Sequence, residues 1–301
     1  MVYVPRRWTV ILRDLADAAR PIRSEDCHGL LNHWWPQPQE DHTAAKRWSM
    51  NGWPAPLGDR LYHWSVSWLD DDPPPVDPET LVGQPQRIGD HLMEPLSVTR
   101  TFDRTYAGML AAARGPFAVR SAVVRSRTPV VMVARDSGGE RIPQVWPSPR
   151  RLFGAVHRSG GGIVGGSGAV GAVARFAPAD LADPWLDLLF GGLAHVRRVP
   201  LPEEPVRVGE HRHNDERTVL GWEGGLRLEL VGGERHHADA FAALLELVEL
   251  SGVGKYTAQG FGAVRVDTMT GAAARVRVPT SRGGGRRARV RTGDFSGTLF
   301  D

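Results

Sequence analysis

The sequence predicts an α+β protein built from two units, each an antiparallel sheet with helices on one face. Three observations support this fold class. The chain has 301 residues, about the length of two domains. Its segments follow the order strand, helix, strands, helix, strand about twice. Its 35 glycines and 23 prolines favour many turns and short elements over a helical bundle.

The first unit opens with a strand and a helix. Residues 8–12 (WTVIL) are apolar and largely β-branched or aromatic, as in a strand. Ser24 begins an N-terminal capping pattern, and apolar residues follow at helical spacing up to Trp35. Pro36 then ends the helix, because proline lacks the amide proton that a helix interior needs.

The rest of the first unit is expected to be mostly strands. Residues 42–48 suit a short helical piece, and the alternating, aromatic residues 61–69 suit a strand. Residues 70–79 are acidic and rich in proline, as in a loop. Residues 80–125 then predict short strands around one helix at about 104–114.

The second unit is expected to begin near residues 120–130. Residues 129–133 (PVVMV) open a new strand, and the prolines within 142–149 indicate extended chain. Residues 159–171 are rich in glycine, which is typical of a flexible hairpin, a loop or a linker.

The clearest elements lie near the end of the second unit. Residues 219–231 predict a strand. Residues 238–250 (ADAFAALLELVEL) predict an amphipathic helix of strong helix formers, followed by a strand at 261–266. The expected division is an N-terminal domain over 1–125, a C-terminal domain over 126–270 and a basic, mobile tail over 271–301.

Positive charge is concentrated in this tail. Residues 271–301 contain seven Arg and two Asp, so residues 1–270 carry a net charge of −2 although the chain carries +3. The overall charge is therefore weak support for nucleic-acid binding by the folded part. Lys46 and Lys255 are the two lysines among 37 basic residues, and they are of interest because lysine and arginine differ in geometry and in how readily their pKa shifts.

The sequence favours a cytoplasmic protein. A single cysteine, Cys27, excludes an intrachain disulfide, which fits a reducing compartment. No apolar run approaches the roughly 18 residues that cross a bilayer. The first 12 residues lack a secretory-signal pattern. We therefore expect no membrane partner.

The segment SGVGKYTAQGFG over residues 251–262 is the sharpest local feature. Glycine permits positive φ and a close approach to a ligand, and exposed amides in such a loop can hold phosphate oxygens. It is neither a Walker nor a Rossmann loop, because it joins a helix to a strand and Thr257 occupies the third glycine position. By itself it also suits a turn that only reverses the chain.

This segment closely resembles the C-terminal glycine-rich signature of the RAMP superfamily, and in particular the CRISPR-associated endoribonuclease that cleaves precursor CRISPR RNA within its repeats. Three further stretches resemble that family: residues 218–227 (TVLGWEGGLR), the proline-containing residues 142–153, and residues 42–49 (HTAAKRWS). The resemblance covers about residues 8–268. It implies two tandem ferredoxin-like (RRM-like) domains that hold RNA across their faces or the cleft between them.

The resemblance also implies a reaction that needs no metal and no cofactor. The ribose 2′-OH attacks the adjacent phosphate and leaves a 2′,3′-cyclic phosphate and a 5′-OH, which requires a base, an acid and positive charge. His42 matches the family's N-terminal catalytic histidine, Lys46 could neutralise the phosphate, and His28 is the alternative. The tyrosine that family members often carry in the first helix has no counterpart, since the nearest are Tyr3 and Tyr62.

RNA contacts are expected from the glycine segment and from two arginine pairs. The expected RNA-binding residues are Gly252, Gly254, Lys255, Thr257, Gly260, Phe261, Gly262, Arg150, Arg151, Arg197 and Arg198. Seven of the ten tryptophans lie between Trp8 and Trp68, and we expect most of them in the core and at most one stacked on a base. The histidines at 211–213 and 236–237 lack metal-site spacing, so no metal is expected.

Three functions are compatible with these observations. The main hypothesis is a metal-independent endoribonuclease that recognises a CRISPR repeat stem-loop, releases guide RNAs and joins other subunits of an interference complex. The alternative is a noncatalytic RAMP RNA-binding subunit of such a complex. The third is an unrelated small-molecule enzyme with a ferredoxin-like fold.

Overall fold

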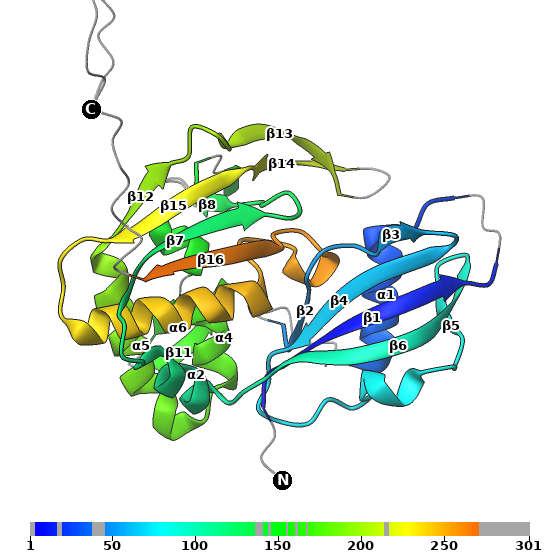
Figure 1. Cartoon of the computed structure of the whole chain (residues 1–301), viewed down its shortest axis with the longest axis horizontal. Helices are drawn as coiled ribbons and strands as arrows, with labels where there is room; N and C mark the ends of the chain where they lie inside the picture. The colour runs from blue at the N-terminus through cyan, green and yellow to red at the C-terminus, as the bar shows by residue number, and fades with distance from the viewer. Residues whose placement is uncertain are drawn as a thin grey trace, which may run out of the picture.

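The chain folds into two lobes that lie side by side (Figure 1). A computed structural model describes residues 4–16, 20–37, 46–135, 141–143, 146–154, 156–159, 162–166, 168–213 and 217–270. We call the part up to residue 104 the first lobe and the part from residue 105 the second lobe. Each lobe contains its own antiparallel sheet and its own hydrophobic core.

The first lobe is a six-stranded antiparallel sheet with one helix on one face. Its elements are β1 (Arg6–Asp14), α1 (Ser24–Trp34), β2 (Trp48–Met50), β3 (Ala55–Gly58), β4 (Leu61–Trp68), η1 (Pro78–Leu81), β5 (Gln86–Ile88) and β6 (His91–Asp103). The strand order is β2-β4-β1-β6-β5, and β3 pairs with β4. The central strand β1 is therefore hydrogen-bonded on both sides.

Tryptophan dominates the core of the first lobe. On β1, Trp8, Val10 and Leu12 point to one side because side chains alternate along a strand, and all three are fully buried. They meet the buried side of α1 and the tryptophans of β2 and β4. Six of the seven tryptophans between residues 8 and 68 are at most 2% exposed, so they are core residues as predicted.

Helix α1 starts one position earlier than the capping pattern predicts. Arg23 occupies the N-cap position and Ser24 is the first helical residue. The side chain of Asp26 accepts a hydrogen bond from the main-chain amide of Arg23 at 3.2 Å, which satisfies a donor that the helix leaves unpaired.

The second lobe has the ferredoxin-like arrangement of four strands and covering helices. Its sheet order is β12-β15-β7-β16, with all neighbours antiparallel. The strands are β7 (Val119–Ser126), β12 (Val196–Pro200), β15 (Gly225–Leu230) and β16 (Val264–Thr270). Helices α4 (Gly168–Phe176) and α5 (Ala179–Ala194) lie between β7 and β12 in the sequence, and α6 (Arg235–Ser251) lies between β15 and β16.

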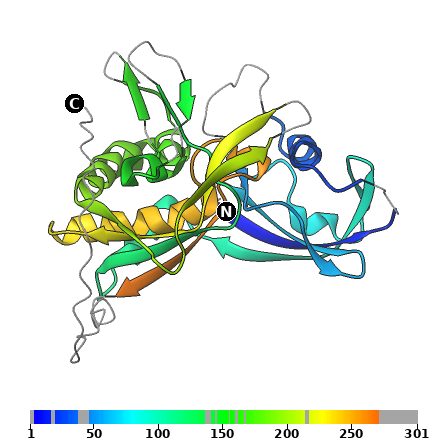
Figure 2. The same ribbon diagram turned by 90° about the horizontal axis from the view of Figure 1, so that it is seen from above.

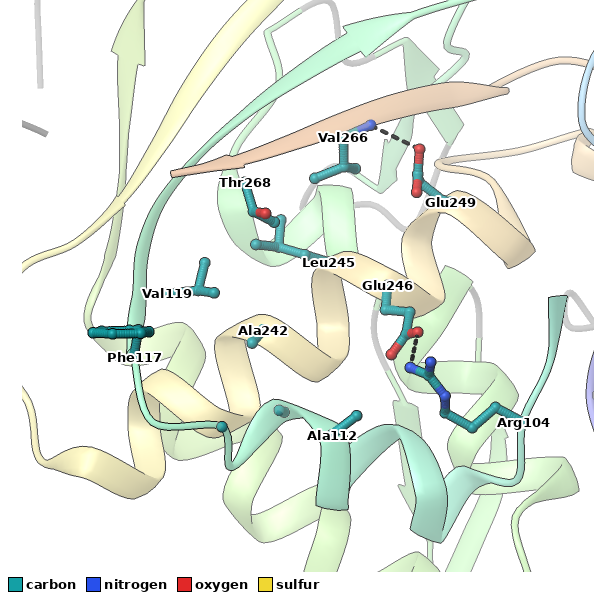
Figure 3. A pocket seen from close by; sticks show the side chains of 12 residues that line it. Arg104, Ala112, Phe117, Val119, Ala242, Leu245, Glu246, Glu249, Val266 and Thr268 are labelled. Carbon is teal, nitrogen blue, oxygen red and sulfur yellow. Dashed lines mark hydrogen bonds and ion pairs between the residues drawn. The ribbon is translucent and has the colours of Figure 1, made fainter. Parts of the chain in front are cut away.

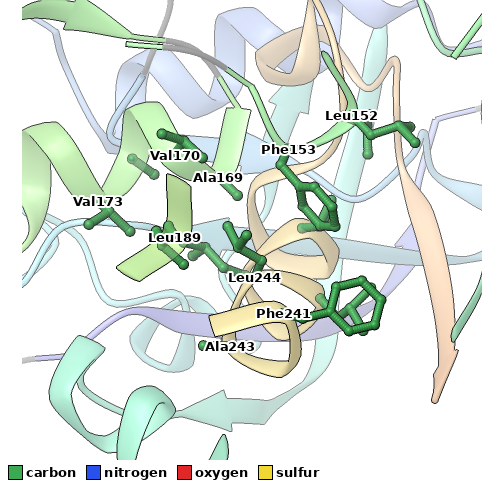
Figure 4. Close-up of a cluster of buried hydrophobic side chains, with 14 of the residues drawn as sticks. Leu152, Phe153, Ala169, Val170, Val173, Leu189, Phe241, Ala243 and Leu244 are labelled. Atoms are coloured by element: carbon green, nitrogen blue, oxygen red, sulfur yellow. The ribbon is translucent and has the colours of Figure 1, made fainter. Parts of the chain in front are cut away.

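Helix α6 joins the sheet of the second lobe to its helical layer. Figure 2 shows the helices on one side of this sheet. Phe241 and Leu244 of α6 are fully buried and pack with Phe153, Val173 and Leu189 (Figure 4). The remaining elements are α2 (Tyr106–Ala113), α3 (Pro149–Phe153), and the hairpins of β8 (Val133–Arg135) with β9 (Arg141–Pro143), β10 (Val156–Ser159) with β11 (Gly162–Gly166), and β13 (Arg207–Arg212) with β14 (Thr218–Glu223).

The lobes divide earlier than the boundary expected at residues 125 and 126. Strand β6 of the first sheet ends at Asp103. Tyr106 and Met109 of α2 are fully buried in the core of the second lobe, and β7 is a central strand of the second sheet. Local sequence propensity predicts the positions of α2 and β7 correctly, but it does not indicate which lobe each element belongs to.

Two other expectations concern segments without a clear periodicity. Within the glycine-rich residues 159–171, β11 and the start of α4 form regular elements rather than a linker. The expected tail over 271–301 lies outside the described residues. In the described part of the chain, no helix is both long enough and apolar enough to cross a membrane.

Candidate functional site

The glycine loop, which we define as residues 252–262, lies where the two lobes meet. It joins α6 to β16 and contains a short turn, η2 (Thr257–Gln259). This turn contacts α1 and β2 of the first lobe. The loop therefore belongs to the second lobe in sequence but forms the junction between both lobes.

Two glycines in the loop are required by close backbone contacts. Gly254 and Gly262 have φ of +81° and +70°, a region that disfavours other residues. A Cβ atom at Gly254 would collide with the carbonyl oxygen of Val131, and one at Gly262 would collide with that of Val253. These glycines allow the main chain of the loop to pack directly on neighbouring main chain.

Four amides of the loop have partners within the protein, so these four cannot form the expected phosphate cradle. The amides of Gly252 and Val253 donate to Val248 O at 2.9 Å and Gly262 O at 2.8 Å. Those of Lys255 and Gly262 donate to Val131 O at 2.7 Å and Pro129 O at 2.9 Å. These four donors cannot also hold a phosphate, because each already has a carbonyl partner.

Other predicted residues of the loop also have structural partners. Phe261 is fully buried, so its ring cannot stack on a base. The methyl group of Thr257 packs against Gly252, since a Cβ atom added to Gly252 would lie 2.9 Å from it. The Lys255 ammonium lies 5.0 Å from the centre of the Tyr256 ring, a cation–π distance. Gly260 packs against the indole of Trp53.

The carbonyl oxygens of the loop receive side chains from the first lobe. Ala258 O accepts from His28 Nδ1 at 2.9 Å, and Gln259 O accepts from Trp53 Nε1 at 2.9 Å. Just before the loop, main-chain carbonyls at the end of α6 also accept hydrogen bonds from side chains of the first lobe. The side chains of Ser49 and Asn51 donate to the carbonyls of Leu250 and Glu249, the second at 2.6 Å. The junction is thus made of hydrogen bonds from one lobe to main-chain acceptors of the other.

These contacts define the protonation pattern of His28. A carbonyl oxygen can only accept, so Nδ1 of His28 carries the proton. Nε2 faces the side-chain amide of Asn32 at 3.2 Å and is the acceptor when the ring is neutral. The ring packs against Trp48 with centres 5.2 Å apart. The His28 ring is therefore held between Ala258 O at Nδ1 and an exposed residue, Asn32, at Nε2.

Lys46 lies in the chain segment that leads to the contact residue of His28. Lys46 is half-buried and comes two residues before Trp48, the residue on which His28 packs. His42 lies outside the described residues, in the stretch that connects Gln37 to Lys46. The structure therefore brings His28 and the Lys46 segment to the same part of the first lobe.

His213 is a residue of this junction that the sequence analysis did not single out. Its Nε2 lies 2.6 Å from the side-chain oxygen of Gln259 in η2, and its ring packs 4.3 Å from the centre of Tyr256. Its main-chain carbonyl accepts from the hydroxyl of Ser24 at the start of α1. Its partners in η2 and α1 are distant in sequence, so no local motif could have indicated these contacts.

The four predicted arginines lie at another edge of the second lobe. Arg150 and Arg151 are exposed on α3, and Arg151 donates to Val133 O at 3.2 Å. On the edge strand β12, Arg198 donates to Pro147 O at 2.8 Å, and Arg197 forms an ion pair with Glu229 at 2.7 Å. The structure gathers these arginines around α3 and β12 and not on the glycine loop.

A separate cavity lies away from all predicted site residues. It has a volume of about 350 Å³ and lies between α2, α6 and β16 (Figure 3). The ion pair of Arg104 with Glu246 and the exposed ring of Phe117 border it. Partial burial raises the pKa of Glu246, although Arg104 opposes this shift. Among the residues with described positions, no cluster of His, Cys, Asp or Glu is arranged to hold a metal ion.

The two lobes and their junction define a tandem ferredoxin-like fold. Solved structures with this fold include a product complex of Cas6 (TTHB231) from Thermus thermophilus. It has a TM-score of 0.62 and 16% identity over 88% of this chain and 99% of that one. A Cas6 (TTHA0078) product complex has a TM-score of 0.59 and 17% identity over 89% of this chain and 100% of that one. A substrate-mimic complex of Cas6 (TTHA0078) has a TM-score of 0.57 and 16% identity over 87% and 99% of the two chains.

These similarities confirm the fold that the sequence resemblance implies. They extend over nearly the whole of each solved chain, so both lobes and their mutual arrangement are shared. No family profile and no curated protein matches the sequence. The similarity is therefore one of architecture.

Proposed function

We propose that the chain binds CRISPR repeat RNA at the junction of its lobes and cleaves it without a metal ion. The observation that carries this proposal is the orientation of His28 by Ala258 O across the junction. Proteins of the same fold have been solved with a product and with a substrate mimic. The sequence resemblance to the repeat-cleaving endoribonucleases points in the same direction.

In this proposal, Nε2 of His28 removes the proton from the ribose 2′-OH. The 2′ oxygen then bonds to phosphorus and the bond to the 5′ oxygen breaks, which leaves a 2′,3′-cyclic phosphate. The departing 5′ oxygen takes a proton from an acid, a role that we assign to His42. Lys46 compensates the negative charge that grows on the phosphate oxygens. Each proton-transfer group contributes about 10²–10⁴ in rate.

The RNA is held by cations and not by loop amides. Lys255 and Arg212 lie on either side of the junction and suit the phosphates of a stem, which proteins recognise through its backbone and shape. Arg150, Arg151 and Arg198, at the edge formed by α3 and β12, are further candidates for contacts with backbone phosphates. Affinity should therefore fall steeply as salt is added.

The test is cleavage of the cognate repeat RNA in the presence of EDTA. The wild type should give a 2′,3′-cyclic phosphate and a 5′-OH. His42→Ala and His28→Ala should each lose most of this activity and still bind the RNA. Cleavage that requires a divalent ion, or that survives the loss of both histidines, contradicts the proposal.

A noncatalytic RNA-binding subunit is the second candidate function. The observation that favours it is the sequence of α1, SEDCHGLLNHW, which lacks the tyrosine common in the catalytic family. Tight binding of repeat RNA without cleavage, in the presence of the partner subunits, would support this function. Absence of RNA binding would favour a small-molecule enzyme of the same fold.

A further inference from the structure

We propose that a cavity beside the junction takes the base of one unpaired nucleotide and stacks it on Trp53, an inference that rests on the proposed RNA-binding function. The cavity has a volume of about 470 Å³, within the range of ligand-binding pockets. Both lobes contribute to it. The lining residues on which the proposal depends are Arg23, Ser24, Glu25, Trp53, Arg212 and His213.

Trp53 provides a fixed aromatic surface. It is the half-buried member of the seven tryptophans between residues 8 and 68, whereas the other six are buried in the core. Its Nε1 donates to Gln259 O at 2.9 Å, and its ring meets Phe261 edge to face with centres 5.3 Å apart. Because both contacts hold the indole in place, a base can stack on it at little cost in side-chain entropy.

The rim of the cavity has the charges that a nucleotide requires. Arg212 is exposed at the end of β13, and Arg23 lies at the start of α1, whose N-terminus carries a partial positive charge. Both suit phosphate oxygens. Glu25 supplies the one carboxylate of the lining, which can accept from the amino group of a base. Nδ1 of His213 is buried and has no hydrogen-bond partner in the described chain.

The cavity is adjacent to the proposed reaction centre. Ser24 of the lining lies four residues before His28, so the two residues occupy the same side of α1 one turn apart. Turn η2 links the same groups, since it binds His28 through Ala258 and both Trp53 and His213 through Gln259. A base in the cavity therefore belongs to a nucleotide close to the scissile phosphate. An unpaired base suits the cavity best, because a base within a helix must first be unstacked and unpaired at a cost in free energy.

The test uses repeat-derived hairpin RNA with unpaired flanking nucleotides and 2′-deoxyribose at the cut site, so that binding is measured without cleavage. In a second set of RNAs, each flanking nucleotide in turn is abasic. One abasic position should lower the affinity of the wild type about tenfold. Trp53→Ala should lose the same factor on the intact RNA and should not respond to that abasic position. Trp53→Phe should retain most of the affinity.

Phe117→Ala is the matched control, because it removes an exposed aromatic ring from the other cavity and should bind like the wild type. If the wild type binds the hairpin tightly but responds to no abasic position, the base pocket is wrong and the RNA-binding function stands. If the wild type does not bind the hairpin at all, both proposals fail. The wild-type measurements decide the question even if Trp53→Ala does not fold.

Discussion

Histidines gather at two places in this molecule, and their surroundings differ. At the junction, His28 and His213 each bond to the glycine loop, which holds them at opposite sides of one turn. At the start of α6, two histidines pack against a third with tilted rings: His237 lies 4.4 Å from His195 and 4.0 Å from His236, measured between ring centres. The junction pair lies beside a cavity, whereas the other three surround a helix end.

The difference shows that the hydrogen-bond partners of a histidine indicate its role better than its sequence neighbours do. His237 Nδ1 accepts from the amide of Glu234, and so completes the cap of α6. His28 instead donates to a carbonyl of the other lobe, and its second nitrogen faces only the side-chain amide of the exposed residue Asn32. We therefore expect the junction pair to affect activity and the α6 group to affect stability.

The largest expected effect is on RNA cleavage, and it is tested with two substitutions of His28. His28→Asn places an amide near the position of Nδ1 and can keep the bond to Ala258 O, but it removes the basic nitrogen. His28→Ala removes both. Cleavage should fall about 10²–10⁴-fold in both variants, while the free energy of unfolding falls by about 1 kcal/mol in His28→Ala alone. Full activity of His28→Asn would show that His28 only joins the lobes.

The next effect tests whether the glycine loop is the scaffold of the junction. Gly262→Ala should lower the free energy of unfolding by about 2–4 kcal/mol, because the new methyl group meets Val253 O at a positive φ. Gly29→Ala is the control: it lies in α1 with nothing within 4 Å of the added atom. It should be neutral or stabilising in the same chemical denaturation measurement. Equal stability of both variants would contradict the scaffold role.

The third expected effect is a pH dependence of stability that arises from the histidines at the start of α6. Partial desolvation, followed by the proximity of His236 and His195, lowers the pKa of His237 below its ordinary 6.5. The unfolded chain therefore binds this proton more readily, and stability falls as the pH drops from about 6.5 through the folded-state pKa. Protonation of Nδ1 also removes the acceptor of the cap. His237→Gln, which keeps an acceptor, should lose part of this dependence in melts from pH 8 to pH 5.

The smallest expected effect is on RNA affinity and concerns the arginine beside each of the two histidine groups. Arg212 precedes His213 and lines the cavity, whereas Arg197 follows His195 by two residues and is paired with Glu229. Arg212→Ala should weaken RNA binding and reduce the slope of log affinity against log salt by about one. Arg197→Ala should change the affinity less than twofold, since its charge is already compensated. Equal losses would mean that charge alone governs RNA binding.

The sequence predicts the elements of this fold better than their assembly. The tryptophan-rich core and the helix of α6 follow from spacing and composition, which are local properties. The assignment of α2 and β7 to the second lobe depends on contacts between distant residues. The glycine loop was located correctly, but the direction of its hydrogen bonds depends on Pro129 and Val131, which lie more than 120 residues earlier.

The same distinction applies to the site. His28 could be named from the sequence, because it lies on a helix next to the segment that resembles the catalytic family. His213 and Trp53 could not, since each is defined by its contact with Gln259. A site assembled at a junction of lobes combines residues that no single motif contains.

The end of α6 has a consequence for how the protein can be divided. The carbonyls of its last turn have no helical partners of their own, and Arg7, Ser49 and Asn51 of the other lobe donate to them. The second lobe expressed alone would expose these carbonyls to solvent and fray at the helix end, and the first lobe alone would leave their donors without these partners. Equilibrium denaturation of the whole chain should accordingly follow one cooperative step, and severed halves should regain their native spectra only when mixed.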